Sequence, residues 1–283
     1  MNTKEFLLSA WNWNPVVIGA CVAALLGYAC LLRFHWTARA WYFLGAVAVF
    51  FLTLISPLNA LADGYLFSAH MLQHMLLLLI VPMLLLLGLP TANANPGGKR
   101  QRFRLPPLVG WFGGVSAMWV WHERTLCDLA TRTETFRVIQ IITLLALGTL
   151  FWWPLLGRQL PRRISPLAGV VYLFSACVAC TVLGILITFA PTGAVCPIYL
   201  HPPDHPGMLS LIRQDWGFTP ATDQQVGGLL MWVPGCGIYL AGVMGMLARW
   251  YRSAETNEPA TTHSTKKDRP QIVIANVNAE KSP

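Results

Sequence analysis

Long apolar segments recur along this sequence and limit the folds open to it. A helix needs about 20 mainly apolar residues to cross a bilayer, and such segments follow one another from about residue 16 to near residue 250. The chain is 55% hydrophobic and only 11% charged, whereas a soluble domain carries roughly 25% charged residues. We therefore predict an all-α, polytopic membrane protein.

Seven transmembrane helices are expected, within one domain that covers residues 1–252. The predicted spans are 16–32, 41–58, 69–89, 108–121, 138–156, 167–190 and 226–250. Residues 253–283 are polar and lack aromatic side chains, a composition that predicts a disordered tail.

The distribution of lysine and arginine predicts the orientation. Connections on one side of the seven spans, with the C-terminal tail, hold 15 of the 20 Lys and Arg residues, and the other side holds five. Positively charged loops stay in the cytoplasm, so the N-terminus is predicted outside and the C-terminus cytoplasmic. These loops explain the formal charge of +8. We expect contact with lipid and no nucleic-acid partner.

This topology places most histidines on the outer side. The outer group is His70, His74, His122, His201 and His205, and the other two histidines, His35 and His263, fall in cytoplasmic segments. Polar or ionisable side chains at membrane helices are costly, and for this reason they mark candidate functional sites. The one-sided distribution is the main functional signal in the sequence.

A pair of histidines opens the third apolar segment. His70 and His74 are four residues apart, so they share one face of a helix. Gln73 lies on that face, where it can orient a ring nitrogen, and Met71 and Met75 lie about 100° further round. Imidazole and thioether groups bind soft metals such as copper. The alternative is two histidines that are hydrogen-bonded to neighbouring helices.

Other outer residues extend this candidate site. His122, at the end of the fourth span, is either a third imidazole ligand or a solvated cap. Asp223, before the seventh span, is either a helix cap or a hydrogen-bond partner of a metal-bound histidine. His201, His205 and Met208 lie in a proline-rich loop, which is either a flexible capture site for metal or simply solvated.

The cysteines are not arranged as a disulfide framework. Cys127 and Cys196 fall in loops on the same side of the membrane, and the sequence leaves open whether they pair. Cys177 and Cys180 form a C-x-x-C pattern inside an apolar segment. Because the pattern lacks the βαβ context of a redox motif, we interpret the two cysteines as small hydrophobic side chains.

Several motifs together resemble one known family. They are SAHMLQHM (68–75), GLP (88–90), WVWH (119–122), FWWPL (151–155), LITFAP (186–191), DQQ (223–225) and WVPG (232–235). In this order they are similar to the CtaG family of cytochrome c oxidase assembly factors. The resemblance implies a seven-span protein needed to mature a haem–copper oxidase, with a role in copper delivery. Members often carry further histidines before the FWWP stretch, whereas residues 133–140 here contain none.

The leading hypothesis is a non-enzymatic assembly factor in the bacterial plasma membrane. Copper, as Cu(I), would bind His70, His74 and His122 on the periplasmic side and pass to a haem–copper oxidase subunit, with a soluble copper carrier as a further partner. Two alternatives remain: a haem-binding membrane redox protein, with axial histidines on facing helices, and a copper transporter, which needs polar ligands that continue through the membrane.

Overall fold

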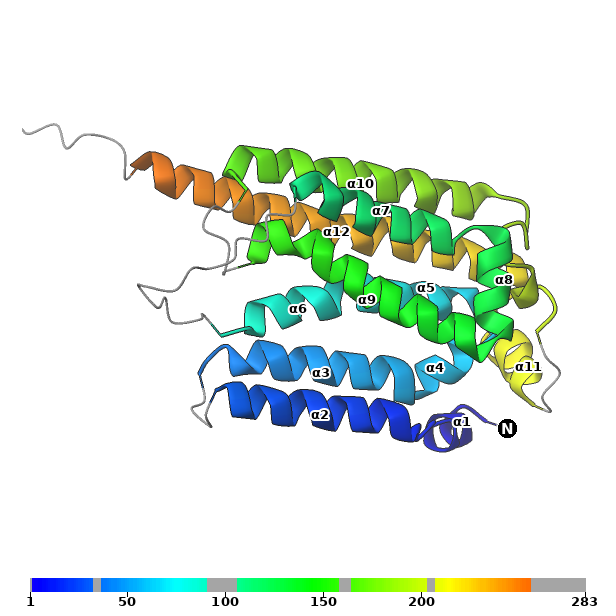
Figure 1. Ribbon diagram of the computed structural model, residues 1–283. Helices are drawn as coiled ribbons and strands as arrows, with labels where there is room; N and C mark the ends of the chain where they lie inside the picture. Colours follow the sequence, from blue (N-terminus) through cyan, green and yellow to red (C-terminus); the bar gives the residue numbers. More distant parts are fainter. Residues whose placement is uncertain (1, 33–36, 91–105, 158–163, 203–206, 256–283) are drawn as a thin grey trace, which may run out of the picture.

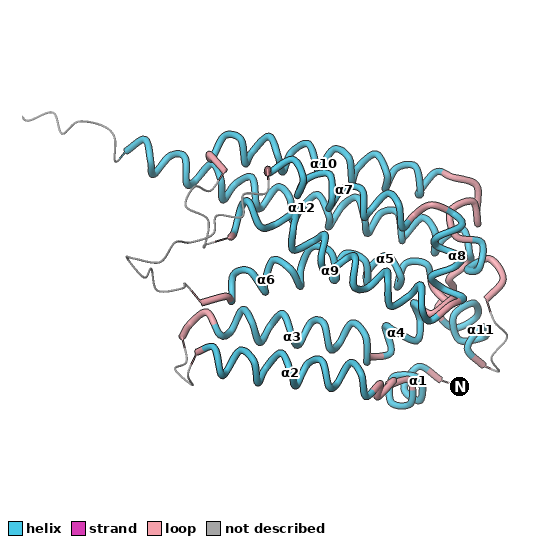
Figure 2. Tube along the Cα trace, in the orientation of Figure 1, coloured by secondary structure: helices cyan, strands magenta, loops and turns pink. Residues whose placement is uncertain are grey.

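The structure is a computed structural model that describes residues 2–32, 37–90, 106–157, 164–202 and 207–255. Every regular element in these ranges is a helix (Figure 2), which confirms the all-α prediction. Helix α12 includes residues 253–255. The rest of the predicted tail, His35, His205 and His263 lie outside the described residues.

Helices occupy all seven predicted segments. These are α2 (Pro15–Leu31), α3 (Ala40–Ile55), the third segment with α5 (Phe67–Met75), the π-helix η1 (Leu76–Ile80) and α6 (Val81–Gly88), then α7 (Pro107–Trp121), α9 (Glu134–Leu156), α10 (Pro166–Phe189) and α12 (Pro220–Glu255). Within the described ranges, four helices are long and apolar enough to cross a membrane: 67–88, 134–156, 166–189 and 220–253. Seven crossings and the orientation stay predictions.

Short helices gather at one end of the bundle, which we call the capped end (Figure 1). They are α1 (Thr3–Ser9), α4 (Pro57–Ala62), α8 (Arg124–Arg132), the 3-10 helix η2 (Pro197–Tyr199), α11 (Met208–Ser210) and the π-helix η3 (Leu211–Asp215). The N-terminus lies at this end, and the C-terminal part of α12 extends beyond the opposite end. The third segment runs through the middle, and 61% of its most apolar window is buried.

The second span ends earlier than predicted. We expected a helix to residue 58, but α3 ends at Ile55 and α4 begins at Pro57. Ser56 between them is extended, and its hydroxyl accepts a hydrogen bond from the Leu58 N–H at 3.3 Å. A serine N-cap followed by proline starts a new helix, so the chain turns here and forms part of the capped end.

The third segment departs from α-helical geometry directly below the histidines. The Val81 N–H bonds to the Leu76 carbonyl, a π-helical spacing, and Pro82 follows without an N–H to donate. Gly148 of α9 packs against this irregular turn: a Cβ atom there would lie 2.9 Å from Pro82 Cγ. Single π-helical turns are frequent at functional sites. Here the turn separates the histidine-bearing half of the segment from α6.

Helices α10 and α12 pack closely through glycines. A Cβ atom on Gly184 would lie 3.0 Å from the Gly228 carbonyl oxygen and 2.8 Å from Trp232 Cβ. Small residues allow such close approach between membrane helices. The Gln224 side chain also holds the end of α10, because its Nε2 donates to the Ile187 carbonyl at 3.0 Å and the Ala190 carbonyl at 2.9 Å.

Candidate metal centre

The helix that carries His70 and His74 is capped by a residue far away in sequence. Leu66, before α5, has no side chain able to accept a hydrogen bond. Asp223 of α12 takes this role: its carboxylate accepts from the Phe67 N–H at 2.6 Å, the Ser68 N–H at 3.0 Å and the Ser68 hydroxyl at 2.6 Å. A carboxylate at a helix N-terminus is favourable, and these bonds fix how α5 sits against α12.

Three imidazole rings converge one to two turns below this cap. The ring centroids of His70 and His74 are 4.3 Å apart, and those of His74 and His122 are 5.2 Å apart. All three side chains are buried, at 4 to 6% exposure. We call them the His cluster. The structure therefore brings together the three residues that the sequence predicted as metal ligands.

Several nitrogens in the His cluster have no hydrogen-bond partner among the described residues. They are His70 Nε2 and both ring nitrogens of His74, all of them buried. Gln140 of α9 lies beside His74, and its Nε2 also lacks a partner there. Buried polar atoms are normally hydrogen-bonded, so these atoms require an explanation. They line a space of about 10 Å³, roughly what one water molecule occupies.

His122 presents its second nitrogen to a sulfur atom. Its Nδ1 bonds to the carbonyl of Met118, one turn back in α7. A carbonyl only accepts, so Nδ1 carries the proton and the Nε2 of a neutral ring has a free lone pair. This Nε2 lies 3.0 Å from Sδ of Met71, which is fully buried. An imidazole nitrogen and a thioether sulfur, both electron-pair donors, thus face each other.

The cluster is not arranged as a complete coordination shell. Within the described ranges, no group of three or more His, Cys, Asp or Glu side chains is placed to hold a metal ion. Of the rings, His122 is fixed by its bond to Met118, whereas His74 has no comparable bond and packs between the other two rings beside Gln140. A metal ion shared by all three rings would require rotation of His70 and His74.

A polar network lies beside the His cluster and extends to the capped end. Gln73 Nε2 donates to the Thr53 carbonyl at 2.9 Å and to Asn59 Oδ1 at 3.1 Å. Arg137 Nη2 donates to the same Asn59 oxygen at 2.7 Å and forms an ion pair with Asp63. Gln73 therefore directs its amide nitrogen toward α3 and α4 and holds them against α5.

An open cavity adjoins the His cluster. It has a volume of about 480 Å³, and its lining combines apolar side chains with polar ones such as Asn12, Asn14 and Glu134. Asp63 and Arg137 border both this cavity and the small space beside His70 and His74. The ion pair between them therefore lies between the open cavity and the small space beside His70 and His74.

A disulfide at the capped end secures the cover of His70. Cys127 of α8 and Cys196, just before η2, are bonded, which answers the question that the sequence left open. Tyr199 in η2 follows Cys196, and its hydroxyl donates to the Ala62 carbonyl at 2.7 Å. Its ring lies 5.8 Å from that of His70. Burial raises the pKa of the Tyr199 phenol, so the hydroxyl stays protonated and keeps this bond.

The comparison with protein families decides the class of the chain. A family model described as cytochrome c oxidase caa3 assembly factor (Caa3_CtaG) matches residues 23–253. The chain belongs to this family of assembly factors. The match confirms the resemblance seen in the sequence motifs, and it includes every residue of the His cluster.

Curated relatives of this chain include uncharacterized mycobacterial proteins. One from Mycobacterium leprae is 22% identical over 274 residues, which cover 86% of this chain and 40% of the relative. Another, from Mycobacterium tuberculosis, is 24% identical over 257 residues, which cover 80% of this chain and 37% of the relative. The chain thus spans about two fifths of the length of these relatives. No solved structure matches it.

The remaining residues that the sequence predicted for the site lie apart from the three rings. His201 is exposed after η2, and His205 lies outside the described residues. Met208 packs against a separate group of apolar side chains around Ala62 and Tyr65. Met75 turns toward α12. Asp223 contacts Phe67 and Ser68, so it acts on the histidines through the position of α5.

Sequence reasoning missed four polar residues next to the cluster. They are Asn59, Asp63, Arg137 and Gln140. Gln140 carried a usable signal, because it interrupts an apolar span. The network of Asn59, Asp63 and Arg137 carried none, since its members come from different helices and connections.

Proposed function

We propose that this assembly factor binds Cu(I) at the His cluster and passes it to a subunit of a haem–copper oxidase. The observation that supports the proposal best is the set of buried imidazole nitrogens of His70 and His74 without hydrogen-bond partners. A bound cation would satisfy them, and buried polar atoms otherwise lower stability. The process makes and breaks metal–ligand bonds only, so we propose no enzymatic reaction.

The donor set suits a soft monovalent ion. Imidazole and thioether ligands favour copper, and Met71 Sδ stands beside His122 Nε2. The two nearby carboxylates have other partners: Asp223 accepts hydrogen bonds from the N-terminus of α5, and Asp63, which borders the small space beside His70 and His74, is paired with Arg137. Neutral ligands leave a bound Cu(I) with a single positive charge, which costs less in an apolar surrounding than a divalent ion.

The proposed orientation places the capped end on the periplasmic side of the bacterial plasma membrane. The charge asymmetry of the connections supports it. The cavity of about 480 Å³ would then open to the periplasm. Asp63, which lines this cavity, would attract a cation, and its ion pair with Arg137 would have to loosen for the ion to reach His74. A soluble copper carrier would deliver Cu(I) at this opening.

The ring geometry favours a metal ion over haem. Axial histidines stand on opposite faces of a porphyrin, whereas the His74 and His122 rings are 5.2 Å apart and nearly perpendicular, at 78°. The adjoining space of about 10 Å³ would not admit the macrocycle between them.

Copper titration tests the proposal. The purified full chain in detergent is titrated with Cu(I) against a chromophoric chelator. His74→Ala should lose one equivalent of copper relative to the unaltered chain, because the central ring is removed. His201→Ala, an exposed histidine outside the cluster, is the matched control and should bind as before. Equal stoichiometry and affinity in His74→Ala and the unaltered chain would refute copper binding at the cluster.

A second readout tests delivery. Cells that lack this chain are complemented with each variant, and the copper content and activity of the haem–copper oxidase are measured in membranes. His74→Ala should leave an oxidase deficient in copper, whereas His201→Ala should restore it. A copper-replete oxidase with His74→Ala would separate the assembly role from the His cluster.

A further inference from the structure

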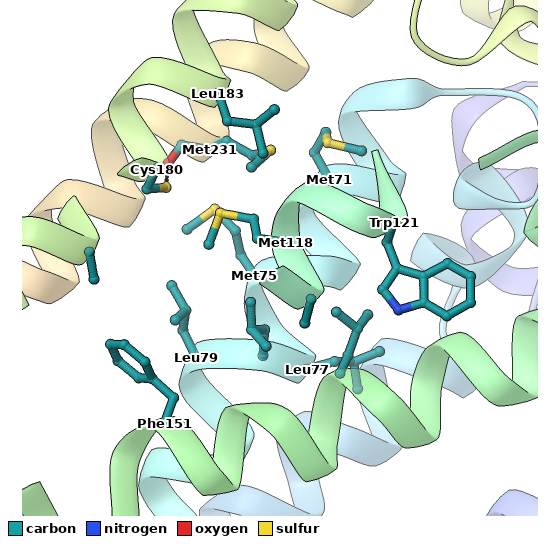
Figure 3. Close-up of a cluster of buried hydrophobic side chains, with 14 of the residues drawn as sticks. Met71, Met75, Leu77, Leu79, Met118, Trp121, Phe151, Cys180, Leu183 and Met231 are labelled. Carbon is teal, nitrogen blue, oxygen red and sulfur yellow. Dashed lines mark hydrogen bonds between the residues drawn. The ribbon is translucent and has the colours of Figure 1, made fainter. Parts of the chain in front are cut away.

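Sulfur atoms are concentrated between the His cluster and the middle of the bundle. Figure 3 shows Met75, Met118, Met231 and Cys180 directed toward one another, with Met71 nearby. All five side chains are buried. They come from α5, α7, α10 and α12, so the gathering results from the fold rather than from one sequence motif.

Two thiols face each other further along α10 and α12. Cys177 Sγ of α10 lies 2.7 Å from Cys236 Sγ of α12. The Thr181 hydroxyl lies 3.0 Å from the Cys236 sulfur. We call Cys177 and Cys236 the Cys pair. Cys180, one turn from Cys177, bonds to the Met231 carbonyl at 3.2 Å instead.

The packing connects this pair to the His-bearing helix. A Cβ atom on Gly235 would lie 3.3 Å from Cys180 Sγ and 3.8 Å from the terminal methyl of Met75. Met75 directly follows His74 in the chain. Gly235, next to Cys236, thus leaves space where the sulfur-bearing side chains of α5 and α10 meet α12.

A purely structural role does not account for the arrangement of the Cys pair. A buried thiol that serves as a small hydrophobic group packs against carbon atoms. Here sulfur meets sulfur across the interface of α10 and α12, with a hydroxyl directed at one of them. Both helices are among those long enough to cross a membrane, and Cys177 lies near the middle of α10.

We propose that Cys177 and Cys236 form a second site for a soft monovalent cation, Cu(I) or its analogue Ag(I), inside the bundle. On binding, the S–H bond of Cys236 breaks, a metal–sulfur bond forms, and the proton is released to water. Cys177 contributes a neutral thiol. One cation replaces one proton, so the net charge of the site stays zero, as an apolar surrounding requires. The Thr181 hydroxyl donates to the Cys236 thiolate.

The site stands on its own residues and does not depend on copper at the His cluster. Soft thiolate ligands select Cu(I), and two-sulfur coordination needs no third protein ligand. The pair must open from its 2.7 Å separation to admit an ion between the sulfurs, a movement that rotation about the cysteine side-chain bonds supplies.

Metal titration with a spectroscopic readout tests the proposal. The purified full chain is titrated with Cu(I) or Ag(I), and the ultraviolet absorption of metal–thiolate bonds is recorded. The Cys177→Ser/Cys236→Ser variant should lose this absorption and one equivalent of metal. The Cys21→Ser/Cys30→Ser variant removes two cysteines of α2 as the matched control, and it should keep both.

Failure of this site and failure of the His cluster are distinguishable. His74→Ala should keep the thiolate absorption while it loses the other equivalent. Thiolate absorption that persists in Cys177→Ser/Cys236→Ser, or that never develops in the unaltered chain, would overturn the proposal. So would mass spectrometry of the protein purified without reductant, if it showed a Cys177–Cys236 disulfide in place of two free thiols.

Discussion

The His cluster and the Cys pair are both groups of potential soft-metal ligands between helices, but they are held in place differently. The His cluster depends on polar interactions between residues distant in sequence: Asp223 caps α5, and the disulfide of Cys127 secures the cover of His70. The Cys pair lies at the interface of α10 and α12, two helices that pack closely through Gly184 and Gly228. Hydrogen bonds and a disulfide near the bundle end thus position the imidazole rings, whereas the close approach of two helices brings the thiols together.

This comparison implies that the two sites can be damaged separately. Changes at the capped end should weaken the His cluster and spare the Cys pair. Changes in the contact between α10 and α12 should do the reverse. The three substitutions below test this separation, from the largest expected effect to the smallest.

Removal of the disulfide should have the largest effect. Cys127→Ser/Cys196→Ser frees α8 from the segment before η2 and loosens Tyr199 over His70. Loss of a native disulfide typically costs about 2–5 kcal/mol, so the thermal unfolding midpoint should fall and copper binding at the His cluster should weaken. The metal–thiolate absorption of the Cys pair should persist. Cys21→Ser/Cys30→Ser, which removes two free cysteines, should leave the midpoint unchanged; equal midpoints for both variants would contradict the expectation.

Removal of the Asp223 cap on α5 should have the second-largest effect. Asp223→Ala leaves the Phe67 and Ser68 N–H groups of α5 without their acceptor. Hydrogen bonds to a charged group contribute about 1.5–3 kcal/mol each, and partial rehydration at the bundle end reduces the sum, so we expect a loss of about 2–4 kcal/mol. Copper affinity at the His cluster should fall with it. Denaturant titration measures the stability.

The control for the cap is Asp128→Ala. Asp128 forms an ion pair with Arg132 on the surface of α8, and such pairs contribute about 1 kcal/mol or less. If both aspartate variants lost the same stability, the cap would not have the role assigned to it.

An added methyl group between α10 and α12 should have the smallest effect on stability, but it should weaken metal binding at the Cys pair. In Gly184→Ala the new Cβ would meet Trp232 Cβ at 2.8 Å. Overpacking costs about 1–3 kcal/mol, and the separated helices should weaken metal–thiolate absorption while copper at the His cluster remains.

Gly237→Ala is the matched control within α12, because a Cβ there meets nothing within 4 Å. It should be neutral or slightly stabilising. An unchanged thiolate absorption in Gly184→Ala would show that the Cys pair tolerates a wider helix separation.

Local signals in the sequence were enough to locate the helices and the central ligands. Apolar length located the seven helical segments, and the four-residue spacing of His70 and His74 predicted their shared face. The Ser56–Pro57 cap was a local signal that we overlooked, so the second span was drawn too long. For His122 the sequence left two interpretations, a third imidazole ligand or a solvated cap, and the structure places its ring 5.2 Å from that of His74.

Contacts between distant segments were not predictable in the same way. Asp223 was expected either to cap a helix or to bond a histidine. Nothing in the sequence indicated that it would cap α5, where its partner Phe67 is 156 residues away in the sequence. Cys177 was interpreted with its neighbour Cys180, whereas the structure pairs it with Cys236. Such partners depend on helix rotation and depth, which periodicity alone does not determine.

Asp223 and Gln224 are consecutive residues that form hydrogen bonds to different helices: Asp223 to the start of α5 and Gln224 to the end of α10. Neither helix can slide along its axis without straining the same short stretch of α12. A protein that docked on the loop after α10 and pulled it would therefore exert force on the segment that carries His70 and His74. Docking of the proposed oxidase subunit and loosening of the proposed Cu(I) ion would then be one mechanical event.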